Sequence, residues 1–182
     1  MKKIAIASLI ALVAGAASAA DYVSVDVDRV TDRTSNEVST AQYVRAGKQI
    51  AGLQFGLQSR TSTNNTSGGM LNSLETTVGK QFGAVTPFVG VGFDNGFNGA
   101  KNADYRYGLV GVTAGAPIGP GFALAGVKTR VGTTAATETA QTVVFGTYSI
   151  PVTKQISANL NVSRSYQDIK ENSMGLGLGF TF

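Results

Sequence analysis

The sequence predicts an all-β fold, a closed up-and-down antiparallel β-barrel with ten strands. Apolar and polar residues alternate with a period of two through most of the chain after residue 20. Stretches of about ten residues are separated by breaks that are alternately short and long. No segment after residue 20 has a convincing helical period, while Val, Thr, Gly and aromatic residues are abundant.

Residues 1–20 have the three-part pattern of a cleaved secretory signal peptide. Lys2 and Lys3 precede an apolar stretch over 4–15, and small residues lead to Asp21. The apolar stretch is shorter than the roughly 20 residues that a membrane-spanning helix needs. We therefore expect a signal peptide over 1–20 and a single barrel domain over 21–182. Without the two lysines the net charge falls from +4 to +2, which predicts no nucleic-acid partner.

The alternation is clearest at 51–60, where Leu53 and Phe55 share one face and Gln54 and Arg60 lie on the other. Regular alternation also marks 23–28, 89–94, 123–131, 156–163 and 173–182. The segments 38–48, 104–116 and 141–150 are less regular, because both faces carry apolar residues. A β-bulge or a change of facing would explain 104–116. Eight strands remain the alternative if one irregular hairpin lies in a loop.

The breaks predict how the strands are connected. Short breaks, three of which contain Pro or Gly, suit tight turns, whereas long polar breaks suit exposed loops. The short breaks are 48–50, 83–85, 117–121 and 151–154, and the long ones are 31–37, 61–69, 95–103, 133–140 and 167–172. An even number of strands with the first beside the last closes a barrel without free edges.

We expect the apolar face of this barrel to point outward into lipid. The opposite face combines glycines with charges and amides, which suits the crowded inside of a small barrel. Short turns at one end, longer loops at the other and aromatic girdles at both interfaces are typical of transmembrane barrels. The expected interface aromatics are Tyr22, Phe82, Phe88, Tyr105, Tyr107, Phe122 and Tyr166.

The last strand carries the sharpest motif. Gly177, Phe180 and Phe182 occupy the positions of a C-terminal signature in which glycine precedes a hydrophobic-x-aromatic ending. In this respect the chain resembles small bacterial outer-membrane β-barrel proteins of the broad OmpA/OmpX-like kind, although Gly175 stands where a polar residue is usual. The resemblance implies residence in the bacterial outer membrane with both termini periplasmic. It also implies outer-membrane lipids and the barrel-assembly machinery as partners, with the three residues as the assembly signal.

The polar face predicts a lumen with charges of both signs. The expected lumen-facing residues are Asp26, Asp28, Arg60, Glu75, Lys128 and Arg130. One hypothesis is a narrow passive pore for small polar solutes or ions, with selectivity set by these charges. The alternative is that the charges pair and plug the barrel. The protein would then be a non-conducting structural or surface-interaction barrel whose outer loops bind a partner.

Catalysis is not expected. The chain has no histidine and no cysteine, so the usual general base and the thiolate ligands are missing. Asp26 and Asp28 share a strand face, but we expect them to be solvated or paired with Arg60, Lys128 or Arg130. The Gly-rich run 175–179 is not followed by a helix, as a dinucleotide-binding loop requires. We predict no catalytic, cofactor-binding or metal-binding residue.

Overall fold

A computed structural model describes residues 21–97, 105–133 and 140–182. The signal peptide predicted over 1–20 lies outside the described residues. The strands are β1 (Tyr22–Asp32), β2 (Val38–Ile50), β3 (Leu53–Asn64), β4 (Met70–Lys80), β5 (Val85–Phe97), β6 (Tyr105–Ile118), β7 (Gly121–Gly132), β8 (Ala140–Pro151), β9 (Ile156–Gln167) and β10 (Glu171–Thr181).

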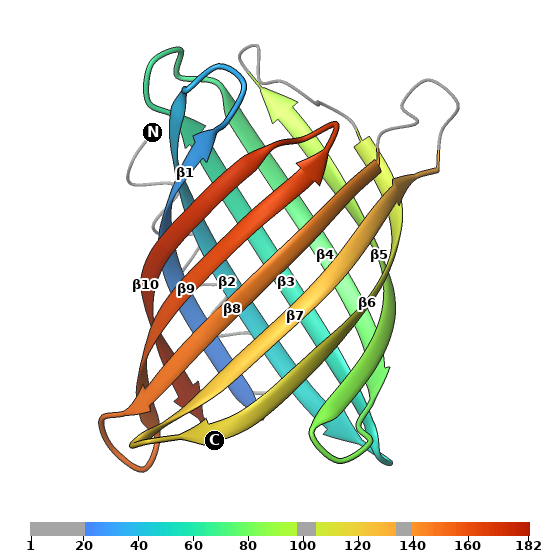
Figure 1. The fold of residues 1–182 in the computed structure, drawn as a ribbon, viewed down its shortest axis with the longest axis vertical. Coiled ribbons are helices and arrows are strands. Elements are labelled where there is room, and N and C mark those ends of the chain that lie inside the picture. Colours follow the sequence, from blue (N-terminus) through green and yellow to red (C-terminus); the bar gives the residue numbers. More distant parts are fainter. Residues whose placement is uncertain (1–20, 98–104, 134–139) are drawn as a thin grey trace.

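The ten strands form one closed antiparallel barrel in chain order, as predicted, and the eight-strand alternative is wrong (Figure 1). Each strand pairs with the next along the chain. The pairing of β1 with β10, which runs from Tyr22↔Thr181 to Asp32↔Glu171, closes the ring. Closure gives every strand two partners, so the barrel wall has no unpaired edge. Among the described residues, no helix is long and apolar enough to span a membrane.

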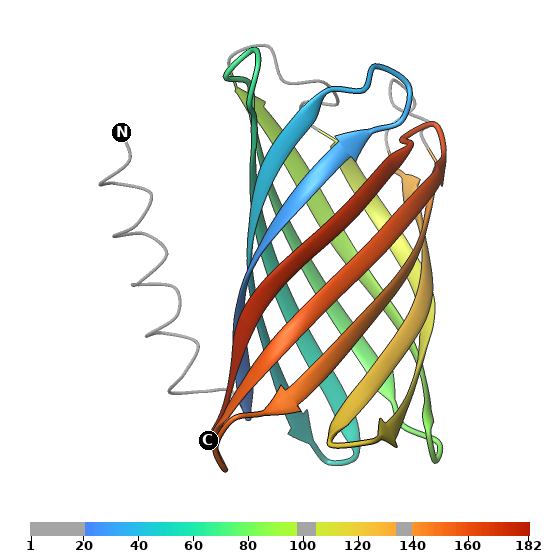
Figure 2. The same cartoon turned by 60° about the vertical axis from the view of Figure 1, so that its left-hand side comes forward.

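The two ends of the barrel differ in their connections. We call the end with the tight connections after β2, β4, β6 and β8 the turn end, and the opposite end the loop end (Figures 1 and 2). Both ends of the barrel sequence lie at the turn end, where the Phe182 N–H donates to the Asp21 carbonyl at 3.1 Å. Ala51 and Gly52 both have positive φ and form a two-residue hairpin turn. The first short break therefore lies at 51–52, so Gly52 is a turn residue and does not face the lumen.

The loops are shorter than the sequence predicted, because the strands continue into the expected breaks. β1 reaches Asp32 and β3 reaches Asn64, which leaves 33–37 and 65–69 as loops. Much of the long breaks expected at 95–103 and 133–140 lies outside the described residues. The strands therefore extend the barrel wall beyond the length that the alternation alone indicated.

The three irregular segments are ordinary strands without a change of facing. In β6 the register to β5 is continuous from Val85↔Ala114 to Asp94↔Tyr105, so the bulge proposed there is wrong. Tyr105, Tyr107 and Leu109 of β6 are buried inside, whereas Val110 is exposed outside. Aromatic residues on the inward face made both faces of this strand apolar, and the sequence pattern could not separate them.

The outer surface of the barrel is apolar. Large hydrophobic side chains on the outward parity of most strands are solvent-exposed, and Leu176 reaches 69%. Others are Val27, Phe55, Val89, Val91, Val110, Val127, Val144, Leu160, Val162, Met174 and Leu178. Soluble monomers rarely expose an apolar surface of this extent.

Candidate functional site: the barrel lumen

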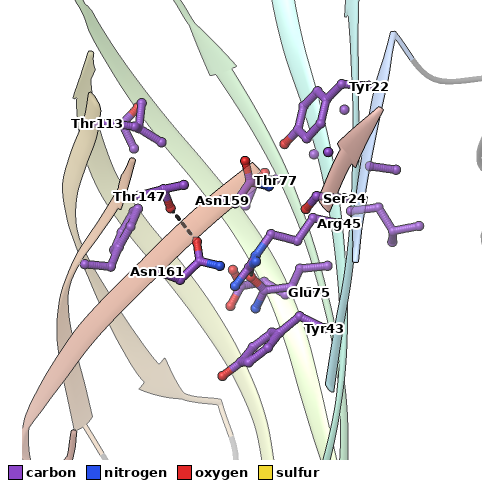
Figure 3. A pocket seen from close by; sticks show the side chains of 18 of the residues that line it. Tyr22, Ser24, Tyr43, Arg45, Glu75, Thr77, Thr113, Thr147, Asn159 and Asn161 are labelled. Atoms are coloured by element: carbon purple, nitrogen blue, oxygen red, sulfur yellow. Dashed lines mark hydrogen bonds between the residues drawn. The ribbon is translucent and has the colours of Figure 1, made fainter. Parts of the chain in front are cut away.

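The lumen holds a cavity of about 730 Å³ that is lined from every strand. Its lining begins at the turn end with residues such as Tyr22 and Ser149, and reaches Arg60, Gln141 and Glu171 toward the loop end. Figure 3 shows Tyr22, Arg45, Glu75, Thr113 and Asn161 converging on this space from different strands. We call this space the lumen cavity.

Glu75 of β4 is the centre of a buried ion cluster. Its Oε1 accepts from Lys128 Nζ at 2.5 Å, and its Oε2 accepts from Arg130 Nη2 at 2.7 Å and Nε at 3.1 Å. Arg130 Nη1 donates to Gln141 Oε1 at 2.8 Å, and its guanidinium lies 5.0 Å from the centroid of the Tyr107 ring. One carboxylate thus holds two cations, which leaves the cluster with a net positive charge.

The ion cluster crosses the lumen instead of following its wall. Glu75 lies on β4, whereas Lys128 and Arg130 lie on β7, with β5 and β6 between them. The inward positions of β5 and β6 at this level include Gly90 and Gly111. Because glycine has no side chain, the long Lys and Arg side chains can pass in front of these strands and reach the carboxylate. The sequence predicted that Glu75, Lys128 and Arg130 face the lumen, and the structure places them in contact.

A second network surrounds Asp26 of β1. Asp26 forms a salt bridge with Arg45 and accepts hydrogen bonds from Ser24 Oγ at 3.0 Å and Asn161 Nδ2 at 2.8 Å. Arg45 Nε donates to Gln58 Oε1 at 3.0 Å. The expected pairing of Asp26 with Arg60, Lys128 or Arg130 is therefore wrong. Arg45 lies nearer to Asp26 in the strand register. It is on β2, whose inward face could not be assigned from the sequence.

Asp28 and Arg60 are buried with weaker partners. Ser173 Oγ donates to Asp28 Oδ2 at 2.6 Å, and Arg60 Nη2 lies 3.5 Å from Glu171 Oε2 across β1 and β2. Asp28 Oδ1 and Arg60 Nε make no hydrogen bond among the described residues. The expected pairing of Asp28 with Arg60, Lys128 or Arg130 is also wrong, since the partner is a hydroxyl. Asp94 of β5 likewise keeps one buried carboxylate oxygen without a hydrogen bond.

The lumen is packed at the loop end and accessible at the turn end. Two clusters of inward side chains are almost completely buried toward the loop end. They are Val30, Ala41 and Tyr43 in one, and Tyr105, Tyr107 and Leu109 in the other. By contrast, the inward rings of Tyr22 and Phe122 at the turn end are each 46% exposed. Within the described residues, the lumen cavity therefore opens toward the turn end.

Aromatic rings in the lumen lie over glycines of neighbouring strands. A Cβ built at Gly92 would be 2.5 Å from the Tyr107 ring, and one at Gly126 would be 2.6 Å from the Phe145 ring. The other such pairs are Tyr22 over Gly47, Phe88 over Gly111 and Phe122 over Gly115. Four of the five are direct cross-strand partners, and Phe122 and Gly115 are diagonal. The rings therefore lie along the wall, which preserves open space in the centre.

These contacts correct part of the aromatic prediction. Five of the seven expected interface aromatics point into the lumen, namely Tyr22, Phe88, Tyr105, Tyr107 and Phe122. Their positions near strand ends agreed with a girdle, but their parity places them inside. Phe82 and Tyr166 are exposed and lie beside cations: Lys80 Nζ is 5.6 Å from the Phe82 ring, and the Arg33 and Arg164 guanidiniums are 5.4 and 5.5 Å from the Tyr166 ring.

The C-terminal motif is divided between the two faces of β10. Gly177 faces the lumen, where a Cβ would be 2.0 Å from Asp26 Oδ1, so a larger residue would displace this carboxylate. Phe180 pairs in register with Val23 and Ile156 on the outward parity. Phe182 is 65% exposed at the turn end.

Several lumen residues were missed by the sequence interpretation. Besides Arg45, they are Asp94, Gln141 and Glu171, which face inward near the loop-end limits of their strands, and Asn161 in the middle of β9. Asn161 alternates regularly with Leu160 and Val162 and was recognisable from that pattern. No group of three or more His, Cys, Asp or Glu side chains suited to a metal ion occurs among the described residues.

Comparison with known proteins supports the architecture. No family model matches the sequence, and no curated protein matches it either. The translocator domain of the autotransporter NalP from Neisseria meningitidis has a similar structure, with a TM-score of 0.53 and 14% identity, over 100% of this chain and 98% of that one. Neisserial surface protein A has a TM-score of 0.46 and 14% identity, over 88% of this chain and 96% of that one. At this identity, the similarity to NalP shows the barrel fold alone.

Proposed function

We propose that the protein is an integral β-barrel of the bacterial outer membrane, with the loop end outside and both termini periplasmic. The exposed apolar side chains on the outward parity support this, because lipid is the environment in which they are stable. The closed ring of strands supports it too, since a bilayer offers no hydrogen bonds to unpaired backbone groups. As partners we propose outer-membrane lipids and, through Gly177, Phe180 and Phe182, the barrel-assembly machinery.

Interfacial residues on the outer wall support the membrane setting. Tyr166 stands near the loop end of β9 with the guanidiniums of Arg33 and Arg164 against its ring. Tyrosine beside long basic side chains suits the boundary between hydrocarbon and headgroups. The apolar residues Leu160 and Val162 precede it on the same parity of the strand.

We propose further that the lumen is closed to solutes, which makes the protein a non-conducting structural barrel in this state. The main support for this closure is the packing of the lumen toward the loop end, where Ala41 and Tyr107 are 0% and 1% exposed. The cross-lumen contacts of Glu75 with Lys128 and Arg130 reinforce the closure. Binding of a partner through the described loops is not favoured, because those loops are short and polar.

A narrow pore is the second candidate, and the lumen cavity is the observation that favours it. Its lining already reaches Gln141 and Glu171, which lie near the loop-end limits of β8 and β10. The loop-end packing, the cross-lumen contacts of Glu75 and the 3.5 Å ion pair between Arg60 and Glu171 would then have to open. We propose no enzymatic role for either form, since the chain lacks histidine and cysteine.

Planar-bilayer recording of the refolded protein separates the two candidates. The closed barrel predicts no conductance above that of the lipid alone, and the pore predicts steady unitary currents. The double variant Lys128→Ala/Arg130→Ala tests the cause of closure, with Lys80→Ala outside the lumen as its matched control. Steady currents from the wild-type protein would refute the closed barrel.

A further inference from the structure

The lumen cavity has an apolar side and a polar side. Phe88, Phe122, Leu124, Val143 and Phe145 line it from β5, β7 and β8. Most of the polar groups line it from the other strands, including Tyr22, Arg45, Gln54, Gln58, Asn159 and Asn161. A lumen that is only filled, or that only passes water and ions, needs no wall of aromatic rings.

The aromatic wall is held flat by glycines. The Phe88, Phe122 and Phe145 rings each lie over a glycine of a neighbouring strand, at Gly111, Gly115 and Gly126. Placed in this way, the rings extend along the wall and leave the centre of the cavity open. A volume of about 730 Å³ lies within the usual 300–1,000 Å³ range of small-molecule sites.

Around Glu75 the cavity lining carries two cations and one carboxylate, while the carboxylates of Asp28 and Glu171 line the cavity elsewhere. Lys128 and Arg130 share the single carboxylate of Glu75, and both cations line the cavity. The Arg45 side chain also lines it and keeps 26% of its surface exposed. An acidic group that entered from the turn end would therefore meet cations after passing the aromatic wall.

We propose that the lumen cavity is a binding site for an amphipathic anion that enters from the turn end. The apolar part of the ligand lies against Phe88, Phe122 and Phe145, and its acidic head points toward Lys128, Arg130 and Arg45. The proposal rests on the membrane barrel proposed above but not on its conductance, because an open pore would contain the same site.

The absence of cysteine from the chain allows a site-specific test. Thr113→Cys places one thiol in the cavity lining on β6, between the strands that carry the rings. The full chain is reconstituted in nanodiscs, and the rate of thiol modification by a small methanethiosulfonate reagent is measured with and without 8-anilinonaphthalene-1-sulfonate. At about ten times Kd, bound ligand slows labelling about tenfold, since the free fraction falls as 1/(1 + [L]/Kd).

Two controls make the result specific. N-phenyl-1-naphthylamine has the same rings without the sulfonate, so it should protect the thiol far less. Thr147→Cys, in the cavity lining on β8, repeats the measurement if Thr113→Cys does not fold. Heat-modifiable gel migration reports the folding of each variant. Equal protection by the neutral amine would show that the site does not require an anionic head. No protection by either compound would show that the lumen cavity is not a binding site for such ligands. If the wild-type barrel does not insert into lipid, the proposed function is wrong. Gel migration and flotation test insertion separately from the labelling measurement.

Discussion

The ring of Tyr107 lies directly over Gly92, its cross-strand partner, and a Cβ at Gly92 would stand 2.5 Å from the Tyr107 Cζ. On its other sides the Tyr107 ring stacks on Tyr105, with centroids 5.1 Å apart, and lies 5.0 Å from the Arg130 guanidinium. The glycine thus makes room for a ring that supports the central ion cluster. Glycine in this lumen is a packing partner of aromatic residues.

Gly92→Ala should therefore destabilise the barrel. The ring cannot tilt away without disturbing Tyr105 and Arg130, and forced repacking of this kind costs about 1–3 kcal/mol. Urea unfolding in lipid vesicles measures the change. Gly108→Ala is the matched control, because a Cβ there meets nothing within 4 Å. Equal unfolding midpoints for the two variants would contradict the packing role of Gly92.

Glu75→Gln should be the most damaging single change in the lumen. It leaves Lys128 and Arg130 buried without their carboxylate, and breaking a buried ion pair costs about 3–5 kcal/mol. Glu171→Gln affects a longer pair, at 3.5 Å, in which the Glu171 side chain is 28% exposed, and it should cost less than Glu75→Gln does. Equilibrium unfolding of both variants under the same conditions gives the comparison. A loss at Glu171 as large as that at Glu75 would mean that the cross-lumen cluster is not the main electrostatic contact.

Asp26→Asn and Asp28→Asn should differ, although the two residues occupy neighbouring inward positions. Asp26 carries the Arg45 salt bridge and two hydrogen bonds, so its loss leaves the partly buried Arg45 without its carboxylate. Asp28 accepts only from Ser173 and keeps Oδ1 without a hydrogen bond among the described residues. The Asp28 variant should therefore remain within about 1 kcal/mol of wild type in unfolding experiments, since an amide still accepts from the hydroxyl. A larger loss for Asp28 than for Asp26 would show that Asp28 has a stronger partner than Ser173.

The alternation of apolar and polar residues predicted the barrel because it shows that most strands have one apolar face and one polar face. Where one face is apolar and the other polar, as at Leu53–Leu57 and at 173–182, both the strand and its facing followed from the sequence. Where large rings face inward, as at Tyr105 and Tyr107, the strand was predicted but its facing was not. Partners such as Arg45 for Asp26 depend on register between strands, which no single strand encodes. The inward facing of the rings could be recognised only from the glycines that they contact on neighbouring strands, and these contacts also depend on the register.

The apolar exterior leads to a prediction that tests whether lipid or water surrounds the barrel wall. Leu176 and Val152 are similarly exposed, at 69% and 64%, but Leu176 lies in the middle of β10 and Val152 in a turn. In a bilayer, arginine near the midplane costs about 2–4 kcal/mol, against about 0–1 near the interface. Leu176→Arg should therefore lower the stability in vesicles much more than Val152→Arg does. If both changes were nearly neutral, as for exposed sites in water, the membrane-spanning barrel would be wrong.

The unequal ends of the lumen predict one-sided access for a small charged thiol reagent. Thr147→Cys places a thiol in the lumen cavity, and Ser62→Cys places one among the buried inward residues toward the loop end. In oriented vesicles, a membrane-impermeant methanethiosulfonate reagent added on the turn side should label the first thiol and leave the second unmodified. Added on the loop side, it should label neither, because Val30, Ala41 and the two stacked tyrosines close the path. Labelling of the Thr147→Cys variant from the loop side would show a continuous channel and would favour the pore over the closed barrel.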